Sequence, residues 1–218
     1  MHWLFNTYLA ILTLAFVTSL ISFKQAYSVH LKLFSIFLGI SLLTEICANY
    51  LIDFLHLDSN YPVYYCFMLV EYIMFAYYFR RIIVSKTTKN IISIFLLIFP
   101  FFWLFTGIFI FNEEKSWNSY VVMAGDLFTI CVSARFLYEL FTADKLIDFK
   151  KSPEFWIAAA LIFYSCCELP ITGILNYLYY NNSSLNGLLQ ILNIIMYLIF
   201  IYAFLCPMIN FMKSSYSQ

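Results

Sequence analysis

The sequence predicts an all-α polytopic membrane protein with seven transmembrane helices, the N-terminus outside and the C-terminus in the cytoplasm. Hydrophobic residues make up 63% of its 218 residues and charged residues only 11%, whereas soluble domains carry about 25% charged residues. The apolar residues gather in seven continuous runs. The basic residues between these runs lie almost entirely on one side of the membrane.

Each apolar run is long enough to cross a bilayer, which takes about 20 mostly apolar residues. A transmembrane β-barrel would instead need alternating apolar and polar positions. The connecting loops are too short for a soluble domain, so residues 1–218 are expected to form a single seven-helix transmembrane domain. The expected spans are about 3–22, 33–53, 62–79, 91–111, 118–142, 154–178 and 186–209.

The basic residues set the orientation of the chain. Of the 12 Lys and Arg residues, Arg135 lies inside a span and Lys115 on one face of the membrane, which leaves ten on the other face. Cytoplasmic loops are enriched in Lys and Arg, so the face with ten is expected to be cytoplasmic. These ten are Lys24, Lys32, Arg80, Arg81, Lys86, Lys89, Lys145, Lys150, Lys151 and Lys213.

The same basic face identifies membrane lipids as a partner, because Lys and Arg next to a bilayer attract anionic headgroups. We prefer this interpretation to nucleic-acid binding. The composition is rich in Phe (25) and Tyr (18) and contains only 5 Gly. Such a bias is typical of an AT-rich genome and favours a bacterial cytoplasmic (inner) membrane protein.

Ionisable residues inside the spans are the main functional candidates, since each costs about 2.5–3.5 kcal/mol at the membrane centre. The outer halves of the spans hold acids and amides and no cation. We expect these side chains to converge on a shared cavity that opens outward and binds a cationic or hydrogen-bond-donating ligand, or keeps some carboxyls protonated. The expected cavity residues are Glu45, Asn49, Glu71, Asp126, Glu168, Gln190 and Asn193.

A structural alternative stays open for each of these residues. Each acid could bond a Tyr hydroxyl or an Asn on a neighbouring helix and so hold the bundle together. Many Tyr and Trp residues, Tyr64 and Tyr78 among them, lie near predicted span ends, as an interfacial aromatic belt requires. Arg135 and Glu139 lie four residues apart, which predicts a structural ion pair near the cytoplasmic end of the fifth span.

Catalytic, metal and cofactor signatures are absent from the sequence. The three His residues, His2, His30 and His56, fall on both sides of the membrane, so they cannot share one metal ion. No phosphate-binding loop or nucleophile elbow occurs. The six Cys residues are expected to be small packing residues, with a bridge between Cys47 and Cys66 as the alternative. The sequence therefore predicts no cofactor and no metal.

Short motifs lie in four of the spans: Thr44-Glu45-Ile46, Tyr61-Pro-Val-Tyr64, Leu69-Val-Glu71-Tyr72, Pro153-Glu-Phe155-Trp156, Leu161-Ile-Phe-Tyr164 and Leu192-Asn193-Ile194. In these motifs the chain resembles a group of small, uncharacterised bacterial proteins with seven transmembrane helices. The His that begins the seventh span in that group is missing here. The group is akin to the seven-helix input modules of sensor kinases, so the resemblance implies a sensor-like fold but no established activity.

Three functional hypotheses follow. The first is an integral membrane sensor or accessory signalling subunit, whose cytoplasmic protein partner contacts the loops at 80–90 and 143–153. The second is a small proton-coupled or cation-linked transporter, which needs polar lining to continue into the inner half, where this sequence is poor. The third is an intramembrane lipid-modifying enzyme, which the missing nucleophile–base pair disfavours.

Overall fold

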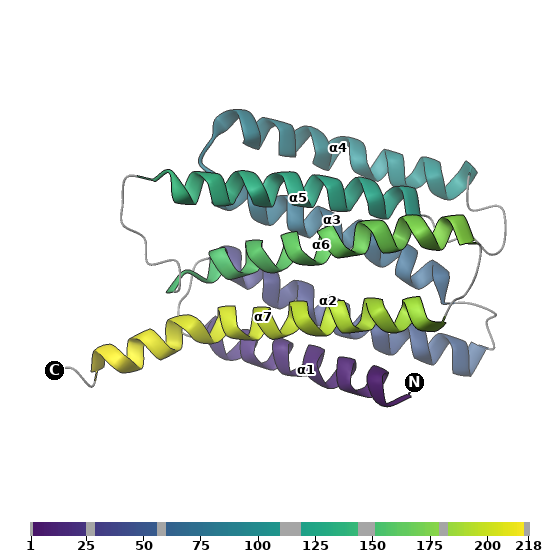
Figure 1. Ribbon diagram of the computed structural model, residues 1–218, viewed down its shortest axis with the longest axis horizontal. Helices are drawn as coiled ribbons and strands as arrows, with labels where there is room; N and C mark the ends of the chain where they lie inside the picture. Colours follow the sequence, from purple (N-terminus) through teal and green to yellow (C-terminus); the bar gives the residue numbers. More distant parts are fainter. Residues whose placement is uncertain are drawn as a thin grey trace.

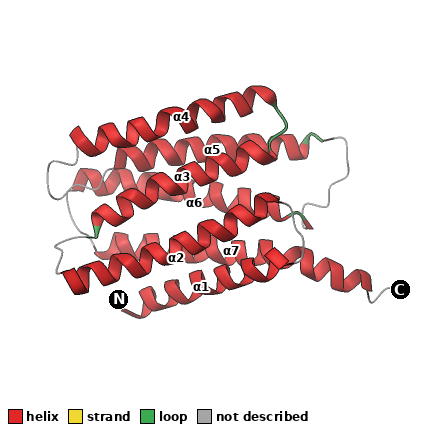
Figure 2. Cartoon of the chain, turned by 180° about the vertical axis from the view of Figure 1, so that it is seen from behind, coloured by secondary structure: helices red, strands yellow, loops and turns green. Residues whose placement is uncertain are grey.

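The computed structural model describes residues 2–24, 29–55, 60–109, 119–143, 151–178 and 183–215. Within these ranges the regular elements are all α-helices (Figure 2), and seven of them are long and apolar enough to cross a membrane. The sequence-based prediction of seven such helices is therefore confirmed. The helices are α1 (His2–Lys24), α2 (Val29–Leu55), α3 (Tyr61–Ile82), α4 (Lys86–Phe109), α5 (Ser119–Phe141), α6 (Pro153–Leu178) and α7 (Ser183–Ser215).

Several helices continue beyond the spans expected from the sequence. Helix α2 begins at Val29, before the expected start at 33, and α3 ends at Ile82, beyond the expected end at 79. Apolar composition marks only the part of a helix that lies in hydrocarbon, about 30 Å. The helix itself goes on until its backbone hydrogen bonds find other partners, so polar residues extend it at both ends.

Six helices form a closed ring, and α4 lies outside it (Figure 1). The packed neighbours run from α1 to α2, α3, α5, α6 and α7, and α7 packs back against α1. Consecutive helices run in opposite directions. One end of the bundle, here named the N-terminal end, therefore holds the start of α1 together with the starts of α3, α5 and α7 and the ends of α2, α4 and α6.

Helix α4 packs on α3 and α5 and turns most of its surface outward. Only 17% of its span is buried, against 50% for the span of α6. The Trp103 indole donates to the Tyr65 carbonyl of α3 at 2.8 Å, and Phe95 stacks on Phe128 of α5. Such an apolar outer surface fits a helix that faces lipid. Its exposed side chains are Ile91, Ile94, Leu97, Ile98, Phe101, Leu104, Phe105, Ile108 and Phe109.

Helices α5 and α6 pack along two rows of small and polar residues. In each row the spacing is seven residues, which keeps the side chains on one face. Small side chains let transmembrane helices approach closely, so this seam closes the ring on the side of α5 and α6. The rows are Ser119, Asp126 and Ser133 on α5, and Ala158, Ser165 and Thr172 on α6, all buried.

An aromatic cluster, here called the aromatic plug, occupies the middle of the bundle. It consists of Phe34 and Phe37 of α2, Phe75 and Tyr78 of α3, and Phe200 of α7, each no more than 2% exposed. The Phe34 ring lies at the centre, 4.6 Å from Tyr78 and 5.3 Å from Phe200. Tyr78, expected in the interfacial belt, is fully buried here because its face of α3 points toward α2.

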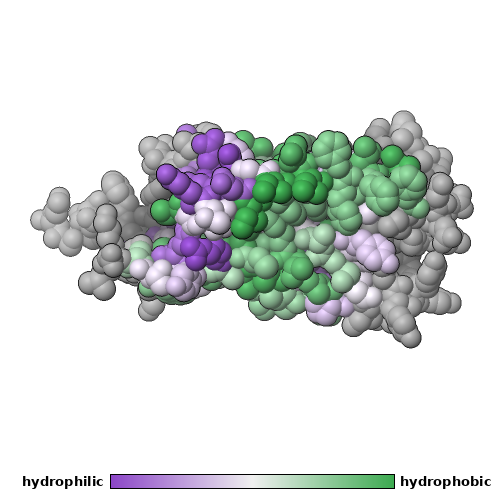
Figure 3. All heavy atoms as spheres, turned by 90° about the horizontal axis from the view of Figure 1, so that it is seen from above, coloured by the Kyte–Doolittle hydropathy of each residue, from purple (hydrophilic) through white to green (hydrophobic). Residues whose placement is uncertain are grey.

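Hydrophilic residues gather at the end of the bundle opposite the N-terminal end. Figure 3 shows them at the left, beside a broad hydrophobic surface. Arg80, Arg81 and Lys86 are exposed there, around the turn between α3 and α4. Lys115 and its neighbours Glu113 and Glu114 lie outside the described residues, and so do Lys145 and Lys150 of the face with ten basic residues.

Candidate functional site

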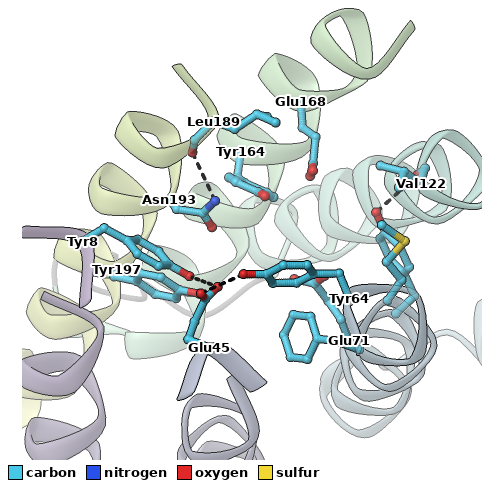
Figure 4. Close-up of a pocket in the computed structure, with 13 residues that line it drawn as sticks. Tyr8, Glu45, Tyr64, Glu71, Val122, Tyr164, Glu168, Leu189, Asn193 and Tyr197 are labelled. Atoms are coloured by element: carbon cyan, nitrogen blue, oxygen red, sulfur yellow. Dashed lines mark hydrogen bonds between the residues drawn. The ribbon is translucent and has the colours of Figure 1, made fainter. Parts of the chain in front are cut away.

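A cavity of about 140 Å³ lies inside the helix ring, toward the N-terminal end (Figure 4). Every ring helix contributes to its wall, and α4 contributes no residue. The aromatic plug begins one helical turn below it, since Phe75 follows Glu71 and Phe200 follows Tyr197. The lining residues are Tyr8, Glu45, Tyr64, Phe67, Met68, Glu71, Tyr72, Val122, Tyr164, Glu168, Leu189, Asn193 and Tyr197.

Glu45 joins three helices at one side of the cavity. Its Oε1 accepts a hydrogen bond from the Tyr8 hydroxyl of α1 at 2.8 Å, and its Oε2 accepts one from the Tyr64 hydroxyl of α3 at 2.9 Å. Glu45 as a residue is 9% exposed. Both oxygens therefore have a protein donor, and the two tyrosines fix the direction in which the carboxyl points.

Asp126 lies behind the cavity wall and reaches the cavity through Tyr72. The Tyr72 hydroxyl is 3.1 Å from Asp126 Oδ1 and 3.3 Å from the Val122 carbonyl. Asp126 is 1% exposed, and Ser165 of α6 lies beside it. Among the described residues, Asp126 Oδ2 is one of four buried side-chain atoms without a hydrogen-bond partner; the others belong to Tyr78, Ser119 and Ser133.

Glu71 and Glu168 line the cavity without the tyrosine pair that holds Glu45. In the part of the chain that the structure describes, no group donates a hydrogen bond to the carboxyl of Glu71. Glu168 is 9% exposed, and Tyr164 lies one turn before it with its hydroxyl near the carboxyl. These two acids are therefore the carboxyls most available to an occupant of the cavity.

The predicted amides differ in position. Asn193 lines the cavity, and its Nδ2 donates to the Leu189 carbonyl at 3.1 Å, which leaves its side-chain oxygen as an acceptor. Asn49 is exposed and donates to the backbone of Glu45 at 2.7 Å. Asn49 and Gln190 lie outside the lining. For Asn49 the reason is local, because its amide folds back on its own helix.

The acids could be identified from the sequence, and a bond from each to a Tyr hydroxyl was one alternative, but the five tyrosines of the cavity wall could not be named. Sequence spacing could have indicated two of these tyrosines. Tyr64 lies seven residues before Glu71, and Tyr164 lies four residues before Glu168. Both intervals put two side chains on one face of a helix. No such interval relates Tyr8 to Glu45, because these two residues belong to different helices.

Most of the remaining described charges lie at the opposite end of the bundle; Asp53, near the end of α2, is an exception. Arg135 Nη2 is 3.3 Å from Glu139 Oε1, the ion pair expected from the sequence. Glu139 also accepts hydrogen bonds from the backbone amides of Val84 at 2.7 Å and Ser85 at 3.3 Å. His30 lies 3.9 Å from Glu154. The cavity lining itself holds no Lys, Arg or His.

Metal and disulfide chemistry find no support in the described residues. There no group of three or more His, Cys, Asp or Glu side chains is placed to hold a metal ion. All six Cys are free thiols. Cys47 and Cys66, the pair considered for a bridge, are both exposed and unbridged, and Cys206 alone of the six is buried.

No family model, curated protein or solved structure matches the chain. The resemblance to seven-helix sensor modules therefore stays a prediction. The chemical character of the cavity comes from its lining. It combines three carboxyls, five tyrosines and one amide with apolar walls, and its net formal charge is negative when the acids are ionised.

Proposed function

We propose that the chain is an integral membrane sensor, or an accessory signalling subunit, that binds a small ligand in the ring cavity. One observation carries the proposal: all six ring helices, and not α4, supply the cavity wall. A ligand changes an equilibrium only through different contacts in its two states. Because every helix of the ring contributes to the site, a bound ligand can influence the position of each helix.

The proposed orientation has the N-terminus outside and the C-terminus in the cytoplasm of a bacterium, with the chain in the inner membrane. It is supported by the ten basic residues of one face and by the positive-inside rule. The cavity then lies in the outer half of the membrane. A protein partner at the cytoplasmic face would detect the ring's rearrangement through the α3–α4 turn and the 143–153 segment.

A small proton-coupled or cation-linked transporter is the second candidate. The buried polar atoms without partners in Tyr78 and Ser133 favour this candidate, because they lie below the level of the cavity. The aromatic plug argues against a transporter, since four fully packed phenylalanines separate the cavity from the His30–Glu154 pair.

An intramembrane lipid-modifying enzyme has less support, because no nucleophile–base pair lines the cavity.

Glu168→Gln distinguishes the sensor from the transporter. For a sensor, we expect altered signalling output in the native cells and unchanged proton-coupled uptake by liposomes containing the protein. Loss of uptake would identify a transporter instead. Glu154→Gln is the matched control, because Glu154 lies on the same helix, fourteen residues away at the other end of the bundle. Normal behaviour of Glu168→Gln in both assays would contradict a binding role for Glu168.

A further inference from the structure

The cavity has more hydrogen-bond acceptors than donors. The Tyr8 and Tyr64 hydroxyls are engaged by Glu45, and the Tyr72 hydroxyl by Asp126. The Tyr164 hydroxyl is directed to Glu168, and the Tyr197 hydroxyl lies beside Tyr8 and Ser41. The Asn193 amide nitrogen is engaged by its own helix. What remains free is acceptor oxygen, chiefly on Glu71 and Glu168. Their oxygens face the cavity, since neither acid is among the described residues that hold buried atoms without a partner. The complementary occupant is therefore one that supplies several donors.

The charge of the cavity wall also favours a ligand that supplies hydrogen-bond donors. Glu45, Glu71 and Glu168 face one space from three different helices, and no cationic side chain lies among the lining residues. Two or more carboxylates in one apolar site repel each other unless a proton or a cation intervenes. An anionic ligand is therefore disfavoured. A neutral ligand requires protons on the carboxyls, whereas a cationic ligand compensates their charge directly.

The volume of the cavity and its apolar walls indicate the size of the ligand and the nature of its uncharged part. A cavity of about 150 Å³ holds a benzene-sized molecule, and this cavity measures about 140 Å³. Its aromatic and apolar side chains, such as Phe67, Met68 and Leu189, offer surface for a short hydrocarbon group. Tyrosine rings also attract a cation through their faces.

We infer that the ligand is a small primary ammonium ion, with its three N–H donors directed to Glu71, Glu168 and the Asn193 oxygen and its carbon chain against the aromatic wall. This inference rests on the receptor function proposed above and names the ligand class of that site. A quaternary ammonium ion has the charge but no N–H donor, so it fits the wall less well. A metal ion lacks a suitable ligand group in the described residues.

The test is a calorimetric titration of the purified protein in lipid nanodiscs at neutral pH. Four probes of similar size distinguish the effect of ligand charge on binding from the effect of hydrogen-bond donors. They are n-butylammonium, tetramethylammonium, butan-1-ol and butyrate. We expect n-butylammonium to bind at least about tenfold more tightly than the other three. Equal binding of tetramethylammonium or butan-1-ol would overturn the ligand class, and so would the absence of n-butylammonium binding.

Two variants locate the binding. Glu71→Gln and Glu168→Gln keep the shape of the side chain and remove its charge, so each should weaken n-butylammonium binding by about tenfold or more. Glu154→Gln should leave it unchanged. Helix content and thermal unfolding identify any variant that fails to fold, and the second variant then carries the test. Unchanged affinity in a folded Glu71→Gln protein would contradict the proposed contact.

The ligand class and the receptor function can fail separately. If n-butylammonium binds as expected but accumulates inside liposomes that contain the protein, the ligand class stands and the receptor function falls. If butan-1-ol or butyrate binds instead and is not transported, a receptor for another ligand remains and the ammonium class falls.

Discussion

At the scale of single residues, the carboxyls around the cavity differ in how they are held. Glu45 has a tyrosine donor on each oxygen, whereas Glu71 has no donor among the described residues. Glu45 thus behaves as a structural joint between α1, α2 and α3. Glu71 is free to respond to an occupant. Of the two roles weighed for these acids in the sequence, the hydrogen bonds support packing for Glu45 and leave binding as a proposal for Glu71.

Tyr64→Phe tests the structural role of Glu45. The substitution removes one hydroxyl donor and keeps the ring, so we expect a loss of about 0.6–1.7 kcal/mol in the free energy of unfolding. Reversible unfolding in mixed detergent measures it. Tyr120→Phe is the control, because Tyr120 is 55% exposed on α5. Equal stability of Tyr64→Phe and the wild type would contradict the role assigned to this bond.

The acids of the site could be predicted from the sequence, but their partners could not. A carboxyl in an apolar span is conspicuous because of its cost. A tyrosine is not, because it suits both a membrane interface and a buried hydrogen bond. Tyr64 and Tyr78 therefore looked alike in the sequence, yet one donates to Glu45 and the other packs against Phe34.

At the scale of the helices, α3 and α5 approach closely at Gly125. A Cβ atom on Gly125 would lie 2.5 Å from ring atoms of Tyr72, so no larger residue fits unless the ring moves. That ring carries the hydroxyl that binds Asp126. The glycine therefore positions both the helix contact and the polar group behind the cavity wall.

Gly125→Ala should destabilise the protein by about 1–3 kcal/mol, the usual cost of overpacking a core. Gly173→Ala is a matched control on α6, where nothing lies within 4 Å of the added atom. There we expect no loss, or a gain of up to about 1 kcal/mol from helix propensity. Thermal unfolding of both variants checks this. A Gly125→Ala protein as stable as Gly173→Ala would show that the contact is not tight.

At the opposite end of the bundle, Glu139 of α5 holds the turn between α3 and α4. Its carboxyl accepts from the amides of Val84 and Ser85, and Arg135 lies beside it. Glu139→Ala should raise amide hydrogen exchange at these two positions by about tenfold or more, since such charged hydrogen bonds are worth about 1.5–3 kcal/mol.

Arg135→Ala serves as the comparison for that exchange measurement. It removes the partly exposed ion pair, which is worth about 0–1 kcal/mol, and leaves the two backbone contacts in place. We therefore expect a small change at Val84 and Ser85. If Arg135→Ala raised exchange as much as Glu139→Ala, the ion pair rather than the backbone contact would hold the turn.

At the scale of the whole molecule, the chain could be divided into seven helices from hydropathy, but the ring could not be foreseen. Helix order alone does not say that α3 packs against α5 and that α4 lies outside. The sequence of α4 does indicate its position outside the ring. It carries no ionisable residue from Asn90 to Phe109 and has the highest mean hydropathy of the seven spans. A helix apolar on all sides suits lipid contact. The six ring helices instead supply the polar groups of the cavity.

The central claim is that this ring holds a small ligand against Glu71. The most direct measurement is native mass spectrometry of the wild type, Glu71→Gln and Glu154→Gln, each extracted gently from its own membrane. The account predicts a small bound mass on the wild type and on Glu154→Gln, and its loss from Glu71→Gln. A chain without any bound mass in all three, or the same bound mass in all three, would contradict it.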